Sequence, residues 1–315
     1  MKTDLIRVRL TAVLIAVSAL TIWGYCQETP SVSIGPVKVA EGAYFLGDFG
    51  CNIAASVGPD GVLIIDSGYK ESTDQVLSAL KKVTDAAIRF VMDTHFHFDH
   101  VGGNEALARE GAVIISQEQA RARMTLPWGG KILDVQWPKL QPYPAAALAR
   151  ISYAESLKVH FNGEEIEALH LPAAHTDGDV IIRFKKANFI HTGDLFLSNG
   201  FTIIDLDSGG TIDGYLAAVD KIISLCDDKT VVMPAHGPVS NREGLLSYRH
   251  MLAVAKDRIA ALITERKTLE EVIAADVTAG LYKGGKSWLD PRLFVYCVYM
   301  DLIKRQGSSK ISVRR

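Results

Sequence analysis

Three histidines and one aspartate lie within a stretch of six residues. His95, His97, Asp99 and His100 form the pattern His-x-His-x-Asp-His. Imidazole and carboxylate groups are the usual ligands of zinc and similar divalent metals. Placed this closely, they would repel one another or be buried without partners unless something binds them. The pattern therefore favours a metal site over the alternative, a solvated histidine-rich turn.

The segments around this motif predict how it is positioned. Apart from Arg89, residues 88–92 are apolar or β-branched, and they predict a strand that ends just before the motif. Two glycines and a helix-like segment, residues 104–110, follow it. We therefore expect the histidines on a loop at the carboxyl end of a strand.

Three later loops have the same sequence pattern: each comes after an apolar strand-like run and carries one potential ligand. These residues are His175, Asp194 and His236. Each alone is weak, since a single His or Asp in a loop usually caps a helix or is solvated. Together with the first motif they supply five imidazoles and two carboxylates, enough for two metal ions. The other histidines lie in predicted strands or a helix and are expected to be structural: His160, His170, His191 and His250.

Asp66 ends a short apolar strand, residues 62–66, and precedes a predicted helix at 71–83. It is either a helix cap or a residue that orients a metal ligand through a hydrogen bond. We favour the second interpretation.

Residues 126–151 break the regular alternation of strands and helices, because prolines and glycines exclude long regular structure. Trp128 and Trp137 lie in this segment. A long ordered loop beside a metal site often forms a lid or a substrate wall. A surface insertion that covers the core explains the composition equally well.

The remaining pattern predicts further alternation of strands and helices. Asn162-Gly163 predicts a hairpin turn between strands at 152–160 and 165–171. The other expected strands are 37–57 with interruptions, 112–116, 179–184, 188–191 and 230–233, and the later expected helices are 211–226, 242–267, 269–275 and 291–305.

The amino terminus has the composition of a signal peptide. Basic residues precede an apolar run at 10–23 that is short for a membrane span, and cleavage is expected after Cys26. An uncleaved anchor or a misassigned start are the alternatives. Export would place the mature protein in a periplasm or outside the cell, without stable membrane insertion. The remaining cysteines, Cys51, Cys226 and Cys297, are scattered and odd in number, so no disulfide framework is expected.

The whole set of motifs resembles the metallo-β-lactamase-fold hydrolases. His95-x-His97-x-Asp99-His100, His175 in His-Thr-Asp-Gly, Asp194 in Thr-Gly-Asp and His236 in Ala-His-Gly occur in the order of that family, across about residues 37–240. The resemblance implies an α/β protein built as an αβ/βα four-layer sandwich. The expected division is a signal peptide at 1–26, the metallo-β-lactamase-like domain at 27–240, and a helical C-terminal extension at 241–315 packed on that domain.

The resemblance also implies roles for the ligands. His95, His97 and His175 would hold one metal, Asp99, His100 and His236 the other, and Asp194 would bridge them. Zinc is expected at both positions, with iron or manganese as alternatives. A hydroxide held between the metals would attack a carbonyl carbon, and Asp99 would aim it.

The substrate is open at this point. The expected substrate is a small molecule with an ester, lactone, thioester or β-lactam bond. True class B β-lactamases are a named alternative, yet Asp194 stands where one major group of them has Cys, and Leu197 stands where that group has a Lys that grips the drug. Lys131 or Lys139 could supply that grip instead. A net charge of −2 without a basic stripe gives no reason to expect nucleic acid, and a non-catalytic metal-binding accessory protein is the remaining alternative.

Overall fold

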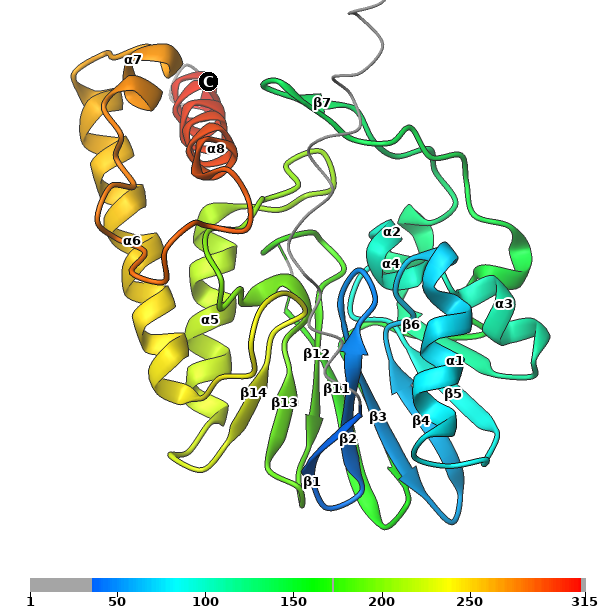
Figure 1. Cartoon of the computed structure of the whole chain (residues 1–315). Helices are drawn as coiled ribbons and strands as arrows, with labels where there is room; N and C mark the ends of the chain where they lie inside the picture. Colours follow the sequence, from blue (N-terminus) through cyan, green and yellow to red (C-terminus); the bar gives the residue numbers. More distant parts are fainter. Residues whose placement is uncertain (1–35, 172, 313–315) are drawn as a thin grey trace, which may run out of the picture. The chain divides into compact units, whose positions relative to one another are not determined.

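The computed structural model describes residues 36–171 and 173–312; the expected signal peptide at 1–26 lies outside the described residues. The described strands form a seven-stranded sheet, a five-stranded sheet and a two-stranded hairpin (Figure 1). No helix within 36–171 and 173–312 is both long and apolar enough to cross a membrane. The cysteines in these ranges, Cys51, Cys226 and Cys297, are free thiols.

The seven-stranded sheet comes from the first half of the chain. Its first four strands pair in antiparallel fashion and its last four in parallel fashion. The strands, in spatial order, are β1 (Val37–Ala40), β2 (Ala43–Asp48), β3 (Asn52–Gly58), β4 (Gly61–Ile65), β5 (Ile88–Met92), β6 (Val113–Gln117) and β9 (Ile151–Tyr153). The helices between them are η1 (Lys70–Ser72), α1 (Thr73–Lys81), α2 (Phe98–Val101), α3 (Asn104–Arg109), α4 (Glu118–Arg123) and η2 (Ala145–Ala147).

The five-stranded sheet and the later helices come from the second half. The strands, in spatial order, are β10 (Ser156–Phe161), β11 (Glu164–His170), β12 (Val180–Phe184), β13 (Phe189–His191) and β14 (Val231–Met233). The helices are η3 (Gly193–Leu195), α5 (Ile212–Leu225), α6 (Arg242–Thr264), α7 (Leu269–Ala274) and α8 (Pro291–Ser312). The hairpin consists of β7 (Lys131–Ile132) and β8 (Val135–Gln136), inside the proline-rich segment.

Alternation along the buried strands creates the layers. In β4, Leu63 and Ile65 join a core shared by both sheets, whereas Val62 and Ile64 point to the opposite face, into the core beneath α1. On the second sheet, Ile181 and its neighbours contact the core formed with α5, α6 and α8. Figure 1 shows α1 and α3 outside one sheet and α5 and α6 outside the other. The predicted αβ/βα sandwich is therefore confirmed.

One predicted strand is wrong. Residues 152–160 do not form a continuous strand, because the chain leaves the first sheet after β9 and enters the second sheet at β10. The predicted hairpin after it is confirmed, since Asn162 and Gly163 both have positive φ, 53° and 72°, as a two-residue turn of this kind requires. The alternating pattern ran across the junction, so the sequence alone did not mark the change of sheet.

Candidate metal centre

The first group of potential ligands consists of three buried histidines. Nε2 of His95 and Nε2 of His175 each lie 3.0 Å from Nδ1 of His97. His95 and His97 come from the loop after β5, and His175 comes from the loop between β11 and β12. The structure thus brings together the three residues predicted to hold one metal.

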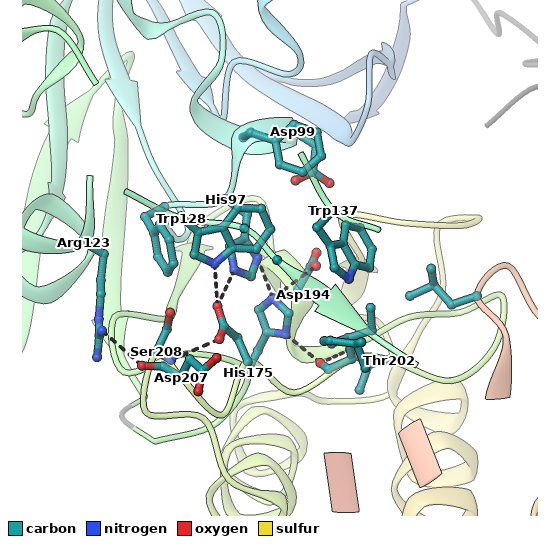
Figure 2. Close-up of a pocket in the computed structure, with 18 of the residues that line it drawn as sticks. His97, Asp99, Arg123, Trp128, Trp137, His175, Asp194, Thr202, Asp207 and Ser208 are labelled. Carbon is teal, nitrogen blue, oxygen red and sulfur yellow. Dashed lines mark hydrogen bonds and ion pairs between the residues drawn. The ribbon is translucent and has the colours of Figure 1, made fainter. Parts of the chain in front are cut away.

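The second group lies beside the first. Nε2 of His236 is 3.3 Å from Oδ2 of Asp99, and the same carboxylate oxygen is 3.7 Å from Nε2 of His100. Asp194 lies between the groups: Oδ1 is 3.3 Å from Nε2 of both His100 and His236, and Oδ2 is 3.5 Å from Nε2 of His175. All seven predicted ligands therefore converge on one site (Figure 2 shows part of it).

The polar atoms at the centre of this site fit metal ions. Nε2 of His100, Nε2 of His236 and Oδ1 of Asp194 are buried and have no hydrogen-bond partner. Such atoms are costly in a protein interior unless something binds them. The ligand atoms of His95, His97 and His175 lie within 4.8 Å of one another, and so do those of Asp99, His100 and His236. A pair of cations would supply the partners that these nitrogens and this oxygen lack, although the ligand roles themselves stay a prediction.

Electrostatics divide the histidines into two kinds. Burial lowers the pKa of His175 to about 4, so this imidazole is neutral and keeps a lone pair for a ligand. Burial also opposes the charged form of His236, but the Asp194 and Asp99 carboxylates outweigh it and raise the pKa to about 9. Burial disfavours the charged form of Asp194, but the imidazoles of His236 and His100 outweigh it and hold the pKa of this carboxyl well below its usual range. The second group thus attracts positive charge, which either a proton or a metal ion provides.

Asp66 makes the contact predicted for an orienting residue. Its Oδ2 lies 2.8 Å from Nδ1 of His100 and accepts a hydrogen bond from the Thr94 hydroxyl, also at 2.8 Å. Helix α1 has Ser72 as its N-cap, so Asp66 caps no helix there. With Nδ1 of His100 held in this way, its Nε2 faces the centre of the site.

Hydrogen bonds to backbone carbonyls position His175 and the loop that carries His236. Nδ1 of His175 lies 2.8 Å from the carbonyl oxygen of Ile203, so its Nε2 points toward His97. The loop that carries His236 is tied to β3, where the Asn52 amide donates hydrogen bonds to the carbonyls on both sides of that loop, at Pro234 and Gly237, each at 2.7 Å.

The first motif differs from the expected loop in one respect. Asp99 and His100 lie on the short helix α2, whereas His95 and His97 lie on the loop before it. A side chain on Gly102 would approach the backbone nitrogen of Lys70 to 2.5 Å. Glycine therefore lets the α2 turn close against the segment after β4.

Asp205 is a site residue that the sequence reasoning did not single out. Its Oδ2 lies 3.0 Å from Nε2 of His97 and accepts a hydrogen bond from the indole of Trp128 at 2.8 Å. The His97 imidazole thus has one nitrogen toward the ligand cluster and the other toward this carboxylate. The sequence did show a carboxylate within the mostly apolar run after Asp194, but it did not indicate that this carboxylate contacts His97.

A cavity of about 300 Å³ opens next to the ligands. Trp128 and Trp137, from the predicted lid or wall, line it together with Leu197 and Lys131. The segment at 126–151 is therefore not a simple surface insertion. Lys139 is not among the residues that line the cavity, whereas Trp288, near the start of α8, is, and sequence reasoning did not point to it.

Comparison with known proteins agrees with this architecture. The family model of the metallo-beta-lactamase superfamily matches residues 46–236. Beta-lactamase-like protein 2 homolog from Caenorhabditis elegans is 24% identical over 227 residues, which cover 70% of this chain and 66% of that protein. The linear primary-alkylsulfatase from a Pseudomonas species is 24% identical over 303 residues, or 82% of this chain and 53% of that protein. The chain thus spans between half and two thirds of the length of these relatives.

Solved structures show the same fold. The inverting sec-alkylsulfatase Pisa1 from Pseudomonas has a TM-score of 0.64 at 16% identity, over 84% of this chain and 50% of that one. A metallo-beta-lactamase from Pontibacter korlensis has a TM-score of 0.56 at 18% identity, over 69% and 98% of the two chains. The match of the family model, the sandwich and the convergent ligand loops lead to one conclusion: this chain belongs to the metallo-beta-lactamase superfamily.

Proposed function

We propose that this chain is an exported, metal-dependent hydrolase that holds two ions, zinc by first choice, and cleaves a carbonyl substrate. The observation that carries the proposal is the set of buried atoms without partners on His100, Asp194 and His236, placed between two triads of ligands. The relatives named as hydrolytic enzymes support the coarser statement of a hydrolase. The export rests on the N-terminal sequence alone.

The residues of the site divide the work of hydrolysis. When bound, the two ions supply Lewis acidity that activates water and polarises the scissile bond. The neutral imidazole of His175 would add no negative charge to an ion that it held, which would keep that ion a strong Lewis acid. Asp194 offers one carboxylate oxygen to each side of the site. Asp99 lines the cavity, where its carboxylate can accept a hydrogen bond from the attacking water and hold it in line. This arrangement requires no serine or cysteine nucleophile.

The substrate class follows from what lines the cavity. Leu197 contributes an apolar surface where the Lys of the resembled β-lactamases would grip a carboxylate, and this disfavours a β-lactam as the natural substrate. Lys131 reaches the cavity and Lys139 does not, so Lys131 is the remaining candidate for such a grip. We therefore place ester, lactone and thioester substrates before β-lactams.

A second candidate is hydrolysis of alkyl sulfate esters. The similarity to the linear primary-alkylsulfatase covers 82% of this chain and so extends beyond the region of the family match. One panel distinguishes the substrates: nitrocefin, a simple lactone, a thioester and an alkyl sulfate, each assayed with the zinc-loaded protein. Turnover of the sulfate alone would replace the carbonyl proposal, and turnover of nitrocefin alone would favour the β-lactamase.

The test of the proposal itself is His97→Ala. We expect the wild-type chain to bind about two zinc ions, and the variant to lose at least one of them together with turnover, because Nδ1 of His97 is one of the three imidazole nitrogens that converge in the first group. Metal content by elemental analysis and hydrolysis rates provide the measurements. His250→Ala is the matched control, since His250 lies on α6 outside the site. Full metal content without activity on any substrate of the panel would instead indicate a non-catalytic metal-binding protein.

A further inference from the structure

The cavity beside the ligands has walls from two distant parts of the chain. One wall is the segment with Trp128 and Trp137, and the other includes Trp288 and Leu289 from just before α8. The second wall lies outside residues 46–236, the region of the family match. Figure 2 shows Trp128 and Trp137 among the side chains that surround the cavity.

Trp288 is held against the centre of the site. Its ring stacks on the imidazole of His236, with centroids 4.1 Å apart and planes at 18°. Its backbone N–H donates to the carbonyl of Asn199 at 2.9 Å, and the neighbouring Ser287 hydroxyl accepts from the backbone of Phe201 at 3.1 Å. Yet 41% of Trp288 remains exposed, so an apolar face stays open toward the cavity.

In the wall formed by the segment with Trp128 and Trp137, contacts with the protein also hold the indole of Trp128 in place. The indole of Trp128 lies 4.7 Å from the ring of His97, and its N–H is held by Asp205. Trp137 lies 6.4 Å from Trp128, centroid to centroid. Each triad of ligands therefore has a tryptophan beside one of its histidines, and both tryptophans line the cavity.

Several polar groups in the walls are already engaged by the protein. Arg123 forms an ion pair with Asp177 at 2.5 Å, and the Thr202 hydroxyl donates to the carbonyl of Ile203 at 2.9 Å. Asp205 is held by His97 and Trp128, as above. What these walls offer a ligand is mainly indole and aliphatic surface, which favours an apolar group.

We propose that Trp288 is a specificity-determining residue, which with Trp128 and Trp137 selects substrates that carry an alkyl or aryl group next to the bond that is cleaved. The position of that bond rests on the proposed hydrolase function. Polar peptide-like substituents, such as that of a glutathione thioester, would leave their hydrogen-bonding groups without partners against these walls. The C-terminal segment thus takes part in recognition and does more than cover the sandwich.

The test measures binding and does not need turnover. Zinc-loaded protein is titrated calorimetrically with acetate, butyrate, hexanoate and octanoate. In the wild-type chain we expect Kd to fall about two- to fourfold for each added methylene. Trp288→Ala should weaken octanoate about tenfold and change acetate by less than twofold, whereas Trp288→Phe should retain most of the octanoate affinity.

Leu246→Ala is the control, because Leu246 is an apolar side chain on α6, 43% exposed and outside the cavity lining. It should leave all four affinities unchanged. Equal affinity for acetate and octanoate in the wild type, an equal loss for both in Trp288→Ala, or loss of zinc from that variant would overturn the proposal. Since these readouts are affinities and metal content, a protein that binds octanoate as expected but hydrolyses nothing would refute the hydrolase function alone.

Discussion

At the scale of single residues, Asp205 connects a predicted ligand to the wall of the cavity. One of its oxygens contacts both the His97 imidazole and the Trp128 indole. A hydrogen bond of this kind fixes the ring orientation of a ligand histidine and increases its basicity. The same carboxylate therefore ties the wall of the cavity to the ligand cluster.

Asp205→Asn should reduce metal affinity about 10- to 100-fold, because the amide keeps the shape but removes the charge that faces His97. Competition with a chromogenic chelator gives the zinc affinity. Asp207→Asn is the matched control, since Asp207 lines the same cavity but contacts no predicted ligand among the described contacts. Equal zinc affinity in wild type and Asp205→Asn would show that this contact does not tune the site.

Residues such as Asp205 and Trp288 mark the limit of sequence reasoning at this scale. His95, His97, Asp99 and His100 were predictable because their types and spacing concentrate in six residues. The role of Asp205 instead depends on its contact with His97, which lies 108 positions away in the sequence. A single carboxylate or indole in a sequence does not indicate which distant residue it will contact.

At the scale of elements, the wall segment depends on one glycine. Gly129 has φ of 110°, and a side chain there would come within 1.8 Å of the carbonyl oxygen of Pro138. The backbone next to Trp128 thus lies directly against the backbone next to Trp137. Only glycine permits this approach.

Gly129→Ala should therefore push these two stretches of backbone apart and raise KM for a substrate with an apolar group by about tenfold, while zinc content stays the same. Steady-state kinetics on the best substrate of the panel measure the effect. Gly130→Ala serves as the comparison, because a side chain at Gly130 meets no atom within 4 Å. Similar KM values for the two variants would exclude this role of the backbone contact.

The C-terminal helices are joined to the sandwich partly by charge. Asp213, in the first turn of α5, forms ion pairs with Lys256 of α6 and Arg305 of α8. The Lys256 ammonium, followed by Arg305, lowers the pKa of Asp213. A lowered folded-state pKa means that the stabilisation is present above the unfolded pKa, near 3.9, and is lost as pH falls through the folded value.

We expect Asp213→Asn to lower the free energy of unfolding by less than about 1 kcal/mol at pH 7, since these groups are partly solvated. The difference from the wild type should narrow below about pH 4. Urea denaturation of the single variants and of Asp213→Asn combined with Lys256→Gln gives the coupling energy. A coupling energy of zero at pH 7 would show that the pair contributes nothing.

Prediction of the elements succeeded where local patterns end clearly. The strand at 88–92 was correct to the residue, because a mostly apolar run stops at a polar motif. The strand at 152–160 was wrong, because the alternating pattern continues through Ala154 and Glu155 while the chain changes sheets. Membership of a sheet depends on partners far away in the sequence, which a local pattern does not contain.

At the scale of the whole molecule, the fold was predicted from the resemblance to a known family, and the match of the family model over residues 46–236 confirms that family. The expected division at residue 240 stays a prediction. The cavity could not be predicted in the same way, because part of its lining comes from Trp288 and Leu289, which lie outside that match.

The change of sheet after β9 has a thermodynamic consequence. His95, His97, Asp99 and His100 precede the junction, whereas His175, Asp194 and His236 follow it. Each predicted metal therefore takes ligands from both halves of the sandwich, so that an ion would act as a cross-link between them. By linkage, the free energy of metal binding becomes free energy of association between the halves.

Removal of zinc should consequently lower the unfolding temperature and, at zinc concentrations near 1,000 times Kd, remove about 4 kcal/mol of stability. Calorimetric scans with and without chelator measure this, and amide hydrogen exchange shows where protection is lost. We expect the loss along Leu63, Ile65 and Ile182, in the core shared by the two sheets. Loss confined to the ligand loops would mean that the sheets hold together without the metals. Loss of protection in that core would instead mean that the centre we propose for hydrolysis also holds the two halves of the sandwich together.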